Sequence, residues 1–512
     1  MFRFFKFFAI WLVVSVMVGL FTLWQWQQSK ADVGFSDIVV HLLIIPTGLV
    51  LLWLGVLWGI HKWRNRMTPT PPAAVPQAGA QDDSETSAAQ QGHAWILDAA
   101  AHTRLGPDPY STLEQVRSAD LRPGLDPELQ DWDGLPVFSA RVADLKCEDE
   151  SVEGGDLDAV KAPLVRRAKA LLQPVVQQLA DKALHALDLL QSDEASSQRM
   201  TDDGDASQLA NLSEGKNHLS GMSARGSSAQ GQGQQFVQWG VRLLMPAGWT
   251  ESDRAELADW LRSMLQEVSA RLHEDQAVAW QVDAPASTEA WWQEFDHEVR
   301  HWSADGPERL WLVVAADSAI DASAVEHWQS IGALFTARHQ TGRIPGEAAA
   351  GLLAVSPRLW SRLSGQWDEP PPVRVHRPVV RRREKSADAV GRVGANALAD
   401  GLAQALNSVS ANGADALIVV ADADHRASRT AELFEALQAV KPGLDPMTQV
   451  MRSGECLGDV GVSNALMSTA LACAAIWSSE EKLMVLAAHV QSSHERVVVA
   501  LCGGADLDVQ PT

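Results

Sequence analysis

The chain has 512 residues, a formal net charge of −22 at pH 7 and four cysteines without paired spacing. Nucleic-acid binding needs cationic surface that displaces phosphate counterions, so the acidic balance argues against a nucleic-acid partner. The cysteine spacing indicates neither a disulfide framework nor a zinc site, and no cofactor is expected.

Two apolar runs near the start of the chain, residues 7–24 and 38–60, have the length of roughly 20 residues that crosses a bilayer as a helix. Arg and Lys lie before the first run and after the second, whereas the connection carries a single Lys. Because Lys and Arg are held on the cytoplasmic side, residues 1–66 are predicted as a two-pass transmembrane hairpin with both termini and the large domain in the cytoplasm. Buried core helices and a cleaved signal peptide are the weaker alternatives, since a second run follows the first almost at once.

The next three segments differ in composition. Residues 67–92, rich in Pro, Ala, Gln and Ser, are predicted as a flexible linker. Residues 93–191 form an N-terminal α/β part of the body, with a strand at 135–142 and a helix at 165–190. Residues 192–235 are dominated by Ser, Gly, Gln, Asp and Asn. This segment is predicted as a disordered loop because it cannot bury enough apolar area to offset its ordering entropy.

The rest of the chain alternates strand and helix patterns in two blocks, residues 236–365 and 393–504, before a short tail at 505–512. Their near-continuous apolar strands predict a mainly parallel sheet covered on both faces. Residues 366–392, which include three consecutive prolines, are interpreted as a connector between two lobes. The basic run 381–383 within it is interpreted as solvated linker, with a partner or lipid patch as the alternative.

Three motifs follow one another in the two blocks. A buried strand ends in Asp317 and Ser318, a turn contains Pro345, Gly346 and Glu347, and a loop with Gly458, Asp459 and Gly461 opens a helix of small residues. The glycines give the backbone freedom where it turns tightly or approaches another segment. In this order the motifs resemble the β-ketoacyl synthases of the thiolase-like superfamily. The resemblance covers roughly residues 236–504 and implies a two-lobed αβαβα body of α/β class.

The catalytic residues of that family are not matched. The resemblance calls for a Cys at the start of the helix near 287–302, where Ser287 is the nearest nucleophile, and for two histidines. His425 falls close to the first histidine position, the glycine loop has no histidine, and Cys456 lies beside that loop. We therefore expect a scaffold without catalysis, with no metal site. Ser287, His425 and Cys456 are the candidates if the fold is active.

The hairpin, the spacer, the segment 134–142 and the degenerate body together are similar to an uncharacterised proteobacterial family. Its known member is an adaptor for lipase effectors of the type VI secretion system. This resemblance implies a protein of the bacterial inner membrane that binds a lipase effector and promotes its loading onto the spike protein. An acyl-handling enzyme and a membrane-bound sensor of an acyl ligand remain the alternatives. A homodimer through the first lobe is a further option that thiolase-like folds use.

Overall fold

The structure, a computed structural model, describes residues 92–118, 121–143, 145–147, 163–211, 237–271, 278–285, 287–302, 306–391, 394–409 and 416–503. The predicted hairpin, the linker up to residue 91 and the tail lie outside these residues. Within the described part of the chain, none of the helices has the length and hydropathy that a membrane span requires.

Eleven strands of the described residues form one sheet. Its order is β11 (Val450–Arg452), β10 (Ala416–Ala421), β12 (Leu483–His489), β13 (Glu495–Gly503), β8 (Val373–His376), β1 (His93–Thr103), β7 (Glu347–Val355), β6 (Arg309–Ser318), β4 (Gln238–Leu244) and β5 (Ala279–Asp283), with β9 (Val379–Arg382) beside β13. The strand pairs at both ends of this order are parallel, and those through the middle are antiparallel. The predicted α/β class is confirmed, whereas the prediction of a mainly parallel sheet is wrong.

Each half of the sheet repeats one order of elements. In the first half β4, α7 (Glu251–Met264), β5, α9 (Thr288–Val299), β6 and β7 occur in this order, with α8 (Gln266–Arg271) after α7 and α10 (Ala322–Ser330) between β6 and β7. In the second half the order is β10, α13 (Ala427–Val440), β11, α15 (Asn464–Trp477), β12 and β13, with α14 (Ser453–Leu457) before α15. The parallel pairs join strands that are connected through helices. The antiparallel pairs include β12 and β13, which follow one another in the chain, and strands far apart in sequence such as β1 and β7. A near-continuous apolar run does not show whether a strand is parallel or antiparallel to its neighbours. The sequence pattern therefore predicted more parallel strand pairs than the sheet contains.

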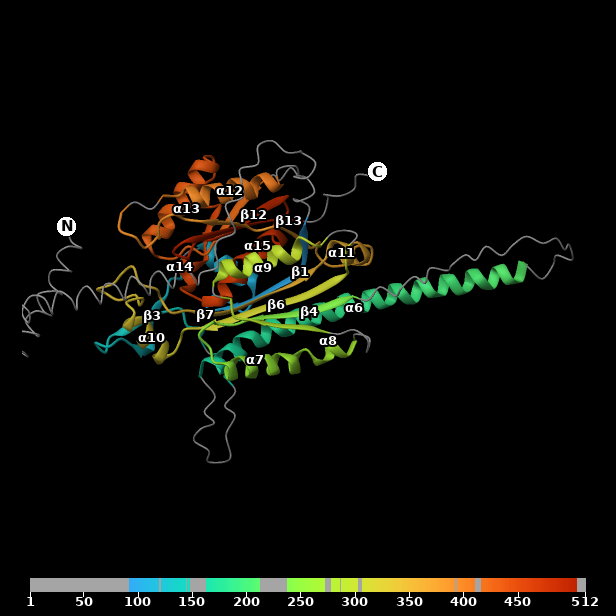
Figure 1. Cartoon of the computed structure of the whole chain (residues 1–512), viewed down its shortest axis with the longest axis horizontal. Coiled ribbons are helices and arrows are strands. Elements are labelled where there is room, and N and C mark those ends of the chain that lie inside the picture. Colours follow the sequence, from blue (N-terminus) through green and yellow to red (C-terminus); the bar gives the residue numbers. More distant parts are fainter. Residues whose placement is uncertain are drawn as a thin grey trace, which may run out of the picture. The chain divides into compact units, whose positions relative to one another are not determined.

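Three hydrophobic clusters separate five layers. One face of the first half packs on α6 (Pro163–Asn211), α7 and α8 (Gln266–Arg271), and one face of the second half packs on α12 (Asn396–Val409) and α13. The inner faces of both halves pack on α15, α9 and α5 (Pro109–Ser118). Figure 1 shows α12 and α13 on one side, α6, α7 and α8 on the other, and α15 and α9 between them. Because side chains alternate along each strand, strands such as β1, β6, β7, β12 and β13 contribute to two clusters.

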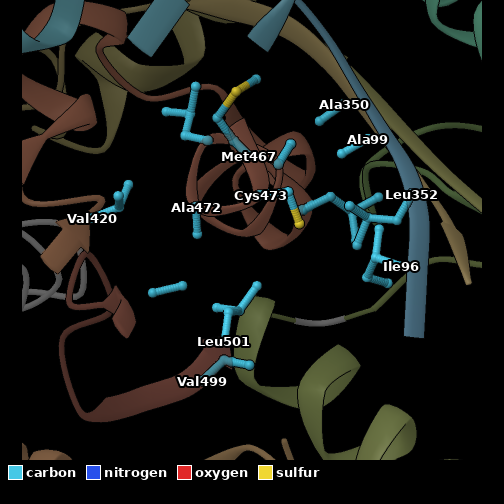
Figure 2. Close-up of a cluster of buried hydrophobic side chains, with 14 of the residues drawn as sticks. Ile96, Ala99, Ala350, Leu352, Val420, Met467, Ala472, Cys473, Val499 and Leu501 are labelled. Atoms are coloured by element: carbon cyan, nitrogen blue, oxygen red, sulfur yellow. The ribbon is translucent and has the colours of Figure 1, made fainter. Parts of the chain in front are cut away.

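Helix α15 occupies the centre of the fold. All its residues from Asn464 to Ile476 are buried, and small residues such as Ala472 let both halves of the sheet approach it. Figure 2 shows Met467 and Cys473 on this helix among side chains from β1, β7, β10 and β13. A helix with bulky residues on every side could not lie between two sheet faces at this separation.

Two predicted boundaries differ from the structure. Helix α6 continues to Asn211, so residues 192–211 of the predicted disordered loop are helical. Its first part contacts β1, β6 and β7, and this packing starts a helix that the polar composition alone does not support. The segment 93–191 is part of the first half of the fold, since β1 lies in the sheet beside β7. The predicted strand at 135–142 shortens to β3 (Pro136–Ser139), which pairs with β2 (Gly124–Gln130) in a separate hairpin.

The predicted connector 366–392 is also corrected. It contains β8 and β9. Strand β8 pairs with β1 and β13 and so joins the two halves of the sheet, and β9 pairs with β13. The basic run 381–383 is not a solvated linker throughout, because Arg383 is only 7% exposed. Its guanidinium forms an ion pair with Glu432 of α13. The sequence pattern did not predict β8 and β9, because each strand is only four residues long and the segment is rich in proline.

A buried charge cluster ties the second half together. The Glu432 carboxylate accepts hydrogen bonds from Arg496 Nε at 2.9 Å and Nη2 at 2.7 Å, in addition to its ion pair with Arg383. Glu432 and Arg496 are fully buried. A bidentate pair in this setting satisfies both charges, but removal of one partner leaves the other charge uncompensated.

We expect Glu432→Gln to lower the free energy of unfolding of the full chain by about 3–5 kcal/mol, because two buried guanidinium groups lose their carboxylate. The midpoint of urea unfolding measures this change. Glu326→Gln, an exposed position on α10 (Ala322–Ser330), is the matched control and should leave the midpoint almost unchanged. Equal midpoints for the two variants would contradict the assigned role of Glu432.

Candidate functional site

A pocket of about 430 Å³ lies where the carboxyl ends of strands meet the first turns of the two inner helices. Strand β6 supplies Asp317, the segment after β10 supplies Asp422, and the segment after β12 supplies Gln491. The starts of α9 and α15 supply Ser287 and Asn464. In open α/β sheets the crevice outside the carboxyl ends of the strands is the usual ligand site, so this pocket is the candidate functional site.

Ser287 lies in the pocket wall as the N-cap of α9. Its φ of −161° and ψ of 163° are extended, and its hydroxyl oxygen accepts a hydrogen bond from the Ala290 amide at 3.2 Å. The hydroxyl also interacts with the Glu289 carboxylate. Ser287 therefore acts as a helix cap, and Ser is among the residues preferred at this position.

The other two catalytic candidates lie outside the pocket lining. His425 packs edge-to-face on Phe335 with ring centroids 5.0 Å apart, and burial lowers the pKa of its imidazole. Cys456 is buried in α14 (Ser453–Leu457), and burial raises the pKa of its thiol. A buried thiol with a raised pKa is a poor nucleophile. The structure therefore brings neither residue to Ser287.

The two loops identified in the sequence contact each other. The Gly346 amide donates to the Asp459 carbonyl at 3.1 Å, and the Asp459 amide donates to the Ile344 carbonyl at 2.9 Å. Pro345 forms an isolated parallel bridge with Asp459. Glu347 is not a turn residue, because it begins β7 and its buried carboxylate accepts hydrogen bonds from Arg167 Nε at 2.7 Å and Ser318 Oγ at 2.8 Å.

The glycines Gly458 and Gly461 have φ values of +66° and +54°, in the left-handed region that favours glycine. A Cβ atom on Gly461 would lie 1.8 Å from Asp317 Oδ2. The Asp317 carboxylate also accepts a hydrogen bond from the Val462 amide at 3.0 Å. The glycine loop thus positions an aspartate of β6 against the first turn of the 3₁₀ helix Gly461–Ser463.

The Asp422 carboxylate connects the ends of β10 and β12 to α15. Its Oδ1 accepts from the Val490 amide at 2.6 Å, and its Oδ2 accepts from Asn464 Nδ2 at 2.7 Å. His489 Nδ1 lies 3.5 Å from the same Oδ2, and His489 Nε2 accepts from Trp292 Nε1 at 3.1 Å. Buried carboxylates are tolerated where several donors satisfy them.

Four pocket residues were not predicted as site residues from the sequence: Glu289, Asp317, Asp422 and Asn464. Two of them could have been found, because Asp317 and Asp422 each stand at the end of a predicted buried strand. Glu289 and Asn464 carry no such signal. The sequence placed both near the start of a predicted helix, but their convergence on one pocket depends on α9 and α15 lying side by side.

The comparisons with known proteins give one family match. Residues 373–500 match the family model described as "Type VI lipase adapter protein Tla3, C-terminal". This range begins with β8 and ends within β13, so it covers the second half of the fold. A search of curated proteins finds no match.

Three solved structures illustrate what the chain resembles. The ishigamide ketosynthase/chain length factor is 15% identical with a TM-score of 0.41, over 81% of this chain and 100% of that chain. A type II PKS acyl-carrier protein in complex with its ketosynthase bound to the hexaketide is 10% identical with a TM-score of 0.48, over 81% and 100%. The ketosynthase from module 1 of the Bacillus amyloliquefaciens bacillaene synthase is 9% identical with a TM-score of 0.47, over 83% and 75%. At these values the likeness carries no conclusion about catalysis.

We expect Ser287→Ala to lower the free energy of unfolding by about 1 kcal/mol, because α9 loses its N-cap acceptor. Ser287→Asn is the matched variant: its side-chain oxygen can still cap the helix, so stability should be largely retained. Thermal unfolding of the two variants beside the wild type measures the difference. Equal stability of Ser287→Ala and wild type would show that the hydroxyl does not support the helix.

The burial of Asp317 should make the free energy of unfolding depend on pH. Removal from water, more than the nearby Asp459 charge, raises the pKa of its carboxyl to about 7, although the side chain keeps some surface open to the pocket. The folded protein therefore holds this proton to a higher pH than the unfolded chain. The stability that Asp317 contributes is complete below its ordinary pKa of 3.8 and is lost as the pH rises to about 7.

Asp317→Asn should remove this decline, since an amide does not titrate. The free energy of unfolding of the wild type minus that of the variant should fall between pH 4 and pH 7, by at most about 1.4 kcal/mol per pH unit, and level off above. Urea unfolding across this range measures the difference. Asp400→Asn, at an exposed position of α12, is the control and should run parallel to the wild type. Parallel curves for Asp317→Asn as well would refute the assignment.

Proposed function

We propose that this protein is a membrane-anchored cytoplasmic adaptor that binds a lipase effector and promotes its loading onto the type VI secretion spike. The observation that carries the proposal is the match of residues 373–500 to the type VI lipase adapter model. The apolar runs at 7–24 and 38–60 support an anchor in the bacterial inner membrane. The anchor would hold the body where effectors meet the secretion machinery.

The proposed role does not include catalysis. Ser287 is engaged in capping α9, and neither His425 nor Cys456 lines the pocket. A serine nucleophile requires an adjacent general base that takes its proton, usually a histidine. The pocket lining of the described residues contains no histidine. These observations support a binding protein over an acyl-transfer enzyme.

A second surface supports binding of a protein partner. The β2–β3 hairpin exposes Leu125, Trp132 and Leu135, which are 60%, 63% and 55% exposed. The Trp132 amide donates to Gln329 Oε1 of α10 at 2.9 Å, which fixes the hairpin against this helix (Figure 1). Trp132 and Leu135 lie in the connection between the two strands, and Trp is enriched among residues that dominate binding energy. We assign this hairpin surface to the lipase effector.

The full chain in membranes is expected to capture the purified lipase effector of its own organism, and the effector-loaded complex to recruit the spike protein. Trp132→Ser with Leu135→Ser should weaken effector binding by at least about tenfold, because apolar anchors are lost. Met447→Ser, at another exposed apolar position, is the matched control. Surface-immobilised binding measurements give both affinities.

Failure of the wild-type chain to bind either protein would rule out the adaptor role. Unchanged binding of the hairpin variant would keep the adaptor but reject the hairpin as its contact. A covalent acyl adduct on Ser287, detected by mass spectrometry after incubation with an acyl donor, would instead establish the acyl-handling enzyme.

A further inference from the structure

The pocket at the starts of α9 and α15 carries more carboxylates than cations. Each of its lining arginines already faces a carboxylate, in the pairs Arg343–Asp459 at 3.2 Å, Arg426–Asp424 at 2.7 Å and Arg429–Asp388 at 2.7 Å. Three further lining carboxylates, Glu289, Asp317 and Asp422, face no arginine or lysine among the described ion pairs. Acidic side chains therefore outnumber arginines in the lining.

These three carboxylates differ in how well they are satisfied. Asp422 accepts hydrogen bonds on both oxygens, from the Val490 amide and Asn464. Glu289 is 2% exposed, and its Oε2 has no hydrogen-bond partner in the described structure. Leaving a buried acceptor without a donor costs about 1–3 kcal/mol, and more for a charged group. Glu289 thus presents an unused acceptor in the wall of the pocket.

The pocket does not suit a metal ion. No three His, Cys, Asp or Glu side chains of the described residues converge as metal ligands. Calcium needs six to eight oxygen ligands, which a cluster of converging carboxylates and carbonyls would have to supply. A volume of about 430 Å³ instead falls in the range of small organic ligands.

We propose that this pocket binds an organic cation, a guanidinium or a primary ammonium group, through Glu289 and Asp317. Its N–H donors would satisfy the Glu289 oxygen and its charge would offset the excess of carboxylates. Guanidinium and ammonium groups only donate hydrogen bonds, so they match a lining of acceptors. The source is a free small molecule or the side chain of an arginine or lysine in another protein.

The chemistry of the two acids is consistent with this ligand. Burial raises the pKa of the Glu289 carboxyl, and that of Asp317 is raised to about 7. Each acid therefore holds a proton more tightly than in water while the pocket is empty. An organic cation supplies the same positive charge together with directed donors. The site is independent of the adaptor role, because it lies at the helix starts and not on the β2–β3 hairpin.

Isothermal titration of the full chain tests the proposal. Agmatine carries both cationic groups and represents a free small molecule, and a blocked arginine dipeptide represents a protein side chain. We expect at least one to bind, and the tighter of the two identifies the source. N-butylacetamide, of similar size and neutral, should not bind. This ligand control does not depend on whether any variant folds.

Glu289→Gln and Asp317→Asn should each weaken binding by at least about tenfold, since each removes one charge and keeps the shape of the side chain. Asp400→Asn on the surface of α12 should bind like the wild type. Urea unfolding midpoints verify that the variants are folded. Absence of binding by both cations, or equal affinity of wild type, Glu289→Gln and Asp317→Asn, would overturn the proposal.

Discussion

Helix α15 is buried on every side between the two halves of the sheet, and the other layers are arranged around it. Its alanines let the two β faces approach the helix closely, while larger residues such as Leu466, Met467 and Leu471 fill the space between the faces. The same burial fixes where α15 begins, because its first turn must meet the carboxyl ends of β6 and β10. The pocket is a consequence of this packing, since helix starts and strand ends converge there.

The loop before α15 transmits this constraint to the first half. Asp459 exchanges backbone hydrogen bonds with Ile344 and Gly346, and Gly461 admits the Asp317 carboxylate where any side chain would collide with it. Glu347, the residue after Gly346, is the first residue of β7, and its buried carboxylate binds Arg167 of α6 and Ser318 of β6. Thus the two halves are joined by backbone pairing and charge as well as by the continuous sheet through β8.

The starts of α9 and α15 converge on the pocket. Ser287 caps its own helix there, and the surrounding groups are mainly carboxylates and paired arginines. The ligand proposed for this pocket is recognised by its charge, and the group beside the Ser287 hydroxyl is the Glu289 carboxylate. Trp132 is not among the residues that line the pocket, so the proposed partner contact and the proposed pocket ligand can be tested separately.

Local periodicity was sufficient to place the buried strands at 310–316 and 416–421, the alternation of strands and helices, and the small-residue helix. These features depend on residues close together in the chain. It could not give strand direction, the central place of β8, or the burial of Arg383 against Glu432. Nor could it gather Ser287, Asp317, Asp422 and Asn464 into one pocket while leaving His425 and Cys456 outside. These depend on partners far apart in sequence, whose burial and pairing arise only when the layers assemble.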